Sequence, residues 1–448
     1  MQKFDAGPEL RSVSPRSFTI ENAILTSNDG NPVEIKNLVQ DIKIHESLNM
    51  SNLIAEVYVV DAANLFFHMK LSGNEKLELV IFRIEPGNEF KEYSLVLNIV
   101  DITNFTEPSP SSKAYTLICM SKHAYLDKEK LLNIPFSGNT NDLIKKIVKS
   151  NLKSDIDIRC STKNSITGIY PNVSPLDAIS WLLRNSFDNN TEVYFYESVK
   201  DGLVLTSYNE MVNQDVFKEY NRIPYNTQTT YRENPEEGKV FKEEQSKIIK
   251  FSSELNLSKM EKTEDGAFGS TLNVIDIATK TVDNPTQFKY KLGKNKIIND
   301  IAPVDNTMTI GDNVKITDWT KYKQYYVSKN SLAFGNKGNY HSTISESLLA
   351  ANSNFQNLDT TMTKIIIPGD FDMTPGKIIS MEVPIQADIS LELIEGKPFL
   401  DTFMSGHYLV STIIHNFSER DGYTMKLSLK KDSFIAQHQL NKEQKESV

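Results

Sequence analysis

The sequence predicts a mainly β protein with α+β insertions, in which two similar antiparallel β-barrels are separated by inserted modules. Three observations predict this fold class. Short runs rich in β-branched and aromatic residues fill residues 38–122 and return at 363–431. Segments with helical periodicity lie between these regions. The two strand-rich regions also resemble one another in order, which indicates an internal repeat.

The composition is typical of a globular protein. Of its 448 residues, 39% are hydrophobic and 24% are charged. The net charge of −9 disfavours affinity for phosphates or for an anionic membrane surface. No stretch approaches the ~20 apolar residues of a membrane span, and the N-terminus shows no signal peptide. Cys119 and Cys160 form no disulfide framework, so we expect a chain made in a reducing cytoplasm and soluble there.

Residues 1–125 are predicted to form the first tube-like β-barrel domain. Its strand-like runs are 53–60, 76–82, 93–100 and 114–120. A loop tip rich in proline and serine, 108–112, separates the last two runs. The close spacing of the runs favours a closed or nearly closed antiparallel barrel.

Residues 126–212 are predicted to form a small α/β module. Two helices and then two strands are expected, at 140–152, 174–187, 192–198 and 202–208. Thr140 is expected to cap the first helix and Ser174 the second, where Pro175 fits the first helical position.

The second tube-like β-barrel domain is predicted to combine residues 213–258 with 341–436. Its expected elements are a loop at 234–239, a strand at 246–257, a helix at 341–358 and strands at 363–368, 407–417 and 423–431. A hairpin is expected at 369–384, because Pro375 and Gly376 suit a type II turn.

Two segments have no clear assignment to a barrel. Residues 259–340 show a weak pattern interrupted by glycines, and we assign them to an accessory insertion of uncertain fold. Residues 437–448 are expected to form a polar C-terminal tail.

The repeat is visible in three pairs of segments. "LSGNEKLELV" resembles "MTPGKIISMEV", "VDITNFTE" resembles "TIIHNFSE", and the next strand begins with Tyr-Thr in both regions. Gly73 is therefore expected to superpose on Gly376, Phe105 on Phe417 and Tyr115 on Tyr423. The alternative interpretation is coincidence between strands of similar composition.

No catalytic, cofactor or metal site is predicted. The histidines are scattered at positions 45, 68, 123, 341, 407, 415 and 438, with no zinc-site spacing. His407 and His415 are expected on one strand face, but eight residues apart. The pairs Asp370 with Asp372 and Glu192 with Glu197 resemble glycosidase carboxylates only in residue type. Carboxylates near turns are far more often solvated or capping groups, so we expect no enzyme.

The order of the segments is similar to that in the central baseplate hub proteins of contractile-tailed bacteriophages, a family of tail hubs that carry a spike. The resemblance rests on the stretches 38–81, 174–186 with 201–214, 369–381 and 407–431. It implies two similar barrels in each chain and a homotrimeric ring with a pseudo-sixfold surface. Such a ring joins the sixfold tail tube to the threefold central spike.

The resemblance also implies partners and a location. These partners are the spike protein, a tail tube or tube-initiator protein and other baseplate subunits, in a virion assembled in the host cytoplasm. Genome DNA would pass through the ring without specific binding. The alternatives are the hub of a bacterial contractile injection system and, in a different class, a cell-wall-binding or cell-wall-degrading tail protein. Exposed aromatic platforms would favour the last.

Overall fold

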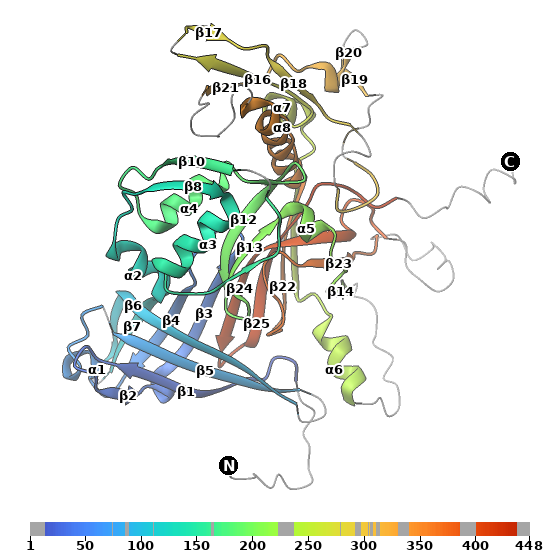
Figure 1. Ribbon diagram of the computed structural model, residues 1–448. Helices are drawn as coiled ribbons and strands as arrows, with labels where there is room; N and C mark the ends of the chain where they lie inside the picture. The colour runs from blue at the N-terminus through green and yellow to red at the C-terminus, as the bar shows by residue number, and fades with distance from the viewer. Residues whose placement is uncertain are drawn as a thin grey trace, which may run out of the picture.

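The computed structural model of the chain describes most of its length. The described residues are 14–73, 75–85, 89–110, 112–162, 165–222, 237–277, 279–291, 297–302, 304, 308–310, 314–329, 340–385 and 400–436. The tail predicted at 437–448 lies outside them. The protein is mainly β, as predicted, and its largest unit is a 13-stranded sheet that runs through the blue and red parts of Figure 1.

The first half of this sheet comes from the N-terminal strand-rich region. In spatial order its strands are β2 (Pro32–Glu34), β1 (Thr19–Thr26), β5 (Lys76–Glu85), β6 (Glu89–Ser109), β7 (Ser112–Ser121), β4 (Ile54–Asp61) and β3 (Val39–Ser47). The short α1 (Leu65–His68) and η1 (Lys36–Leu38) lie in its connections. Alternation sets the buried face: Leu77, Leu79 and Ile81 of β5 are fully buried.

The second half comes from the C-terminal region and two earlier strands. Its strands are β15 (Lys250–Leu255), β22 (Thr361–Pro368), β25 (Gly422–Lys431), β24 (Gly406–Ser418), β23 (Ile378–Glu382) and β14 (Lys218–Asn221). Residues of both halves pack into one hydrophobic core. β24 pairs with β3 from Thr412 opposite Ser47 to Ser418 opposite Asp41, and this pairing joins the halves into one sheet.

The internal repeat is present in the strand pairing. The first half pairs in the order β3-β4-β7-β6-β5 and the second in the order β15-β22-β25-β24-β23, with every pair antiparallel. Each half has a register shift at an equivalent place, between Ile99 and Asp101 of β6 and between Val410 and Thr412 of β24. A shared order and a shared bulge make coincidence of composition an insufficient explanation.

The residue-level equivalences need correction. The shared bulge aligns Cys119 of β7 with Leu429 of β25, because these residues face it from the partner strand. Four residues earlier stand Tyr115 and Met425, so the expected match of Tyr115 with Tyr423 is wrong by two residues. The even shift kept both tyrosines on the same face, which is why the sequence pattern did not expose the error.

The expected match of Phe105 with Phe417 is also not supported. β6 has a further register shift between Thr103 and Thr106 that β24 lacks. Phe105 is consequently 46% exposed, whereas Phe417 is 1% exposed.

The Pro-Gly turn forms, but the predicted hairpin does not. Gly376 has a φ of 84° and Gly73 a φ of 86°, the region that favours glycine in such turns. The residues before the turn, 369–374, form no strand, however, and β23 after the turn pairs with β14 and β24. The local sequence specified the turn, and long-range pairing decided the neighbours of β23.

The predicted α/β module lies beside the first half, in green in Figure 1. Its elements are α2 (Lys122–Glu129), β8 (Pro135–Asn139), α3 (Thr140–Ser150), β9 (Ile156–Ile158), β10 (Ser165–Ile169), α4 (Pro175–Leu183), β11 (Phe187–Asp188), β12 (Thr191–Ser198), β13 (Gly202–Ser207) and α5 (Tyr208–Val212). Ser174 caps α4 as predicted. The cap of α3 is Asn139 rather than Thr140, because the Asn139 side chain accepts the N–H of Asn141.

The segment without a sequence assignment contains a second, smaller sheet at the top of Figure 1. Its elements are α7 (Lys259–Glu264), β16 (Gly269–Asp276), β17 (Thr281–Val282), β18 (Thr286–Lys289), β19 (Thr309–Ile310), β20 (Val314–Lys315), η2 (Ile316–Asp318) and β21 (Gln324–Ser328). The predicted helix follows as α8 (Tyr340–Leu358), whereas the loop predicted at 234–239 gives way at its end to α6 (Glu237–Gln245). Among the described helices, none has the length and apolarity needed to cross a bilayer.

Candidate functional site: the junction of the two halves and the free strand edges

The junction between the halves is held by buried polar groups as well as by strand pairing. The Tyr93 hydroxyl donates to Glu46 Oε1 at 2.8 Å and lies 3.1 Å from His415 Nε2. His415 Nδ1 lies 2.9 Å from the Tyr423 hydroxyl. All four side chains are buried, so the network has little access to water. Hydrogen bonds in such a low-dielectric environment are stronger than in water, so this network helps to hold the two halves together.

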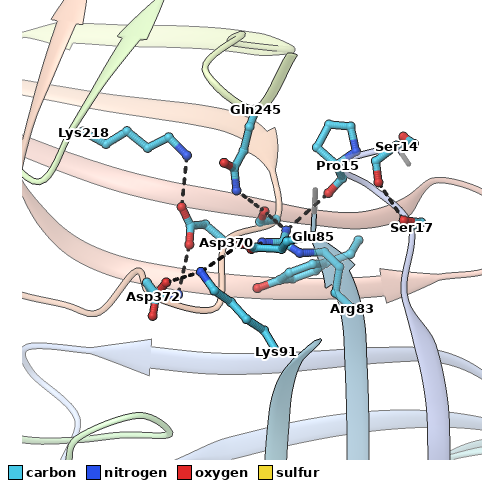
Figure 2. A network of polar contacts seen from close by, with 12 residues as sticks. Ser14, Pro15, Ser17, Arg83, Glu85, Lys91, Lys218, Gln245, Asp370 and Asp372 are labelled. Carbon is cyan, nitrogen blue, oxygen red and sulfur yellow. Dashed lines mark hydrogen bonds and ion pairs between the residues drawn. The ribbon is translucent and has the colours of Figure 1, made fainter. Parts of the chain in front are cut away.

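A second network surrounds Arg83, which is 1% exposed at the inner face of β5 (Figure 2). Its Nη1 donates to the carbonyl of Gly369 at 2.5 Å and to that of Pro15 at 3.4 Å, and its Nη2 pairs with Glu85. Gln245 of α6 also donates to the Gly369 carbonyl. The guanidinium therefore connects β5 of the first half to the segment that follows β22 in the second.

The Phe371 and Tyr423 rings complete the surroundings of Arg83. Its guanidinium carbon lies 5.4 Å from the Phe371 ring centroid and 5.9 Å from that of Tyr423. Desolvated contacts of this kind stabilise a buried cation through the ring quadrupole. The sequence held a signal for this residue, since Arg83 continues the inward phase of Leu77, Leu79 and Ile81.

Asp370 and Asp372 lie in the same network and are engaged by lysines rather than facing a cleft as a pair (Figure 2). Asp370 is buried and pairs with Lys218 at 3.1 Å. Asp372 pairs with Lys91 and with Lys200, each at 2.6 Å. Partial burial opposes ionisation of Asp372, but the two lysines outweigh it and lower its pKa to about 2.

Replacing Asp372 gives a testable pH dependence. The carboxylate stabilises the folded state above the unfolded pKa near 4, and that stabilisation is lost as pH falls towards about 2. Because the group is partly exposed, we expect Asp372→Asn to cost only about 1 kcal/mol of unfolding free energy at pH 7. Chemical denaturation at pH 7 and at pH 2.5 checks this, and an equal cost at both values would contradict it.

Glu192 and Glu197 share strand β12 but not a site. At strand rise they lie about 16 Å apart, and an odd spacing points them to opposite faces. Burial raises the pKa of Glu192 to about 7, and its Oε1 accepts the Tyr194 hydroxyl. Glu197 accepts the Ser121 hydroxyl at 2.6 Å and lies 2.9 Å from His123, contacts that join the α/β module to the first half.

The prediction that His407 and His415 share a face is wrong. Tyr408 and Val410 point into the core before the bulge in β24, and Ile413 after it. The bulge reverses the alternation, so His415 is buried while His407 points to the opposite face.

The two cysteines are buried in the structure. Cys119 and Cys160 are buried free thiols, and burial raises the pKa of each to about 12. In the described part of the chain, no group of three or more metal-ligating side chains comes together.

Two of the open strand edges among the described residues occupy places equivalent to the two strands that pair at the junction. Beyond Asn98, where its pairing with β5 ends, β6 continues to Ser109 with only β7 beside it. β15 has β22 as its one strand neighbour. Open edges present rows of unpaired N–H and C=O groups that template pairing with another chain.

The comparisons with known proteins agree with this architecture. No family model matches the chain, and no curated protein matches it in sequence. Solved structures of similar fold include two tail proteins. The tail protein from Neisseria meningitidis MC58 is 13% identical, with a TM-score of 0.52 over 93% of this chain and 97% of that one. The 43 kDa tail protein of prophage MuSo2 from Shewanella oneidensis is 10% identical, with a TM-score of 0.52 over 92% and 99%. The chain therefore has the fold of these phage tail proteins, which agrees with the family that the resemblance in its sequence indicated.

Proposed function

We propose that the chain is the structural hub of a phage tail baseplate. Three copies form a ring whose six similar halves, each barrel-like, match the sixfold tail tube on one side and carry the threefold spike on the other. The fold shared with two tail proteins supports the tail assignment. The repeat within one chain supports the arrangement of three chains in a ring.

The single observation behind the ring is the pairing of β24 with β3. In each half, β24 and β6 occupy equivalent places, and so do β15 and β3. Within the chain, β24 of the second half thus pairs with β3 of the first half. The corresponding pair is left open: β15 at one end of the sheet, and the part of β6 beyond Asn98, where its pairing with β5 ends. Pairing β6 of one copy with β15 of the next repeats the internal contact between chains.

The internal register predicts the register between chains. Ile414 of β24 pairs with His45 of β3. Thr103 holds the place of Ile414, since each lies four residues beyond the shared bulge's first residue. Glu254 holds the place of His45 when the pairing is followed through the neighbouring strands. Thr103 of one copy therefore lies opposite Glu254 of the next.

Symmetry fixes the number of copies. A heterologous contact closes into a ring only when its rotation divides a full turn. Two similar halves in each of three chains give six similar units, which is the count a sixfold tube requires. In the ring, the edges of β6 and β15 are paired with each other between chains. They are therefore not available for the uncontrolled strand pairing that open edges invite.

The other parts of the proposal follow the assignment to a tail. We infer the domain boundaries given above, with 213–258 and 341–436 in one domain. The partners would be the spike, a tube or tube-initiator protein and other baseplate subunits. Net charge of −9 per chain supports passage of DNA without specific binding. The hub of a contractile injection system is the alternative within the same mechanical class.

Native mass spectrometry tests the proposal. We expect a species of about 152 kDa, three times the 50.8 kDa chain, with an interface of ~2,000 Å² or more. We expect the trimer to form either from the free chain alone or when the spike protein is added. A stable dimer or a true hexamer in the presence of the spike would contradict the proposal.

A further inference from the structure

A groove lies on the accessory module, at the end of the molecule farthest from the first half in Figure 1. It measures about 540 Å³, within the range of ~300–1,000 Å³ typical of small-molecule sites. It is formed where β18 meets the segment after η2. Its lining includes Gln287, Lys289, Asp318, Trp319, Lys321 and Tyr322.

The aromatic residues of the groove are placed by contacts that leave their rings accessible. Tyr322 is 59% exposed, and its hydroxyl donates to Glu264 Oε1 at 3.2 Å. Trp319 is half-buried at the end of η2, where its backbone N–H donates to the Ile316 carbonyl. The neighbouring Thr320 carbonyl accepts the Thr271 hydroxyl at 2.6 Å, which ties this segment to β16. Two large aromatic side chains are thus held beside open space.

The polar residues of the groove are also arranged before any ligand binds. Lys289 Nζ pairs with Asp318 Oδ1 at 2.6 Å. Gln287 supplies an exposed amide with two donors and an acceptor. Among the described residues, no acid lies within ion-pair distance of Lys321, which gives the groove one uncompensated positive charge.

We propose that this groove binds an acidic saccharide. The apolar C–H face of a pyranose stacks on an aromatic ring because the face of the ring is negative and the C–H edge is positive. The hydroxyl groups of the sugar can form hydrogen bonds with the Gln287 amide and with the Lys289–Asp318 ion pair, each of which offers both donors and acceptors. A sugar carboxylate pairs with Lys321 through a charge-assisted hydrogen bond. This binding goes beyond the hub proposal and does not depend on the ring.

The test titrates the full-length protein with tetragalacturonic acid by calorimetry. We expect saturable binding that weakens roughly tenfold in Tyr322→Ala and in Trp319→Ala, and that weakens likewise in Lys321→Ala. Tyr326→Ala is the matched control, because Tyr326 is 63% exposed on the same module but does not line the groove. Because Tyr322 is mostly exposed, we expect Tyr322→Ala to fold normally. The site can therefore still be tested if Trp319→Ala fails to fold.

Two further ligands separate the components of the proposal. Maltotetraose, which is neutral, is expected to bind more weakly than tetragalacturonic acid, and equal binding would overturn the acidic assignment. Tetraglutamate carries the charge without the sugar rings, and binding as tight as that of the saccharide would overturn the saccharide assignment. Absence of binding by tetragalacturonic acid, or equal loss in Tyr326→Ala, would overturn the site.

Discussion

Leu255→Pro is expected to abolish the trimer and leave a folded monomer. The N–H of Asn256 donates to the carbonyl of Thr360, the residue before β22, so alternation points the N–H of Leu255 to the open edge of β15. Proline removes this donor and places its ring at the edge, where a fold tolerates it but a partner strand does not. Each of the three contacts in the ring loses about 1–3 kcal/mol, which lowers the assembly constant roughly 10²- to 10⁶-fold.

Leu255→Ala is the matched control for this variant. It removes the same side chain, which is 39% exposed, and keeps the backbone donor. Sizing with light scattering, together with thermal unfolding, distinguishes the outcomes. The account is contradicted if the proline variant remains trimeric, or if the alanine variant dissociates as completely as the proline variant.

Arg83→Met is expected to cost about 3–5 kcal/mol of unfolding free energy. Removing one partner of a buried ion pair is strongly destabilising, and Glu85 would keep only its longer contact with Lys91. Here Glu85 loses its nearest cation, and the Gly369 carbonyl loses its closest donor. Because Arg83 joins segments of both halves, the loss acts on the junction and not on one strand alone.

Lys91→Met provides the comparison, measured by the same denaturant titration. Lys91 also pairs with Glu85, at 3.1 Å, but its side chain is 33% exposed. Exposed pairs contribute at most about 1 kcal/mol, so this variant is expected to remain close to the parent. If the two variants lose equal stability, the buried guanidinium does not hold the junction in the way described.

The sequence predicted the repeated half-sheets well because their signals are local. Residues 423–431 alternate cleanly and occur as one strand, and Gly376 takes the positive φ that its turn implied. Order along the chain then exposed the duplication, and the pairing orders agree with it. The residue-level matches failed because a bulge shifts register without changing composition.

The rest depended on contacts that no local pattern encodes. In the accessory module, β16 pairs in parallel with β21 across an intervening segment of weak periodicity. The partners of Arg83 come from three separated parts of the chain, around Pro15, Glu85 and Gly369. Its burial was readable from strand alternation, but its partners were not. The open edges likewise became visible only when each strand's neighbours were known.

Disulfide cross-linking tests the central claim most directly, because it reports which strand edges meet. Thr103→Cys combined with Glu254→Cys places two thiols on strands expected to face one another between chains, at a spacing that a disulfide accepts. The native Cys119 and Cys160 are buried and do not compete. Under mild oxidation in the presence of the spike protein, the account predicts one covalent product, the closed ring of three chains at about 152 kDa, and none from either single variant. Only monomer, or an open ladder of dimers and longer chains, would contradict it.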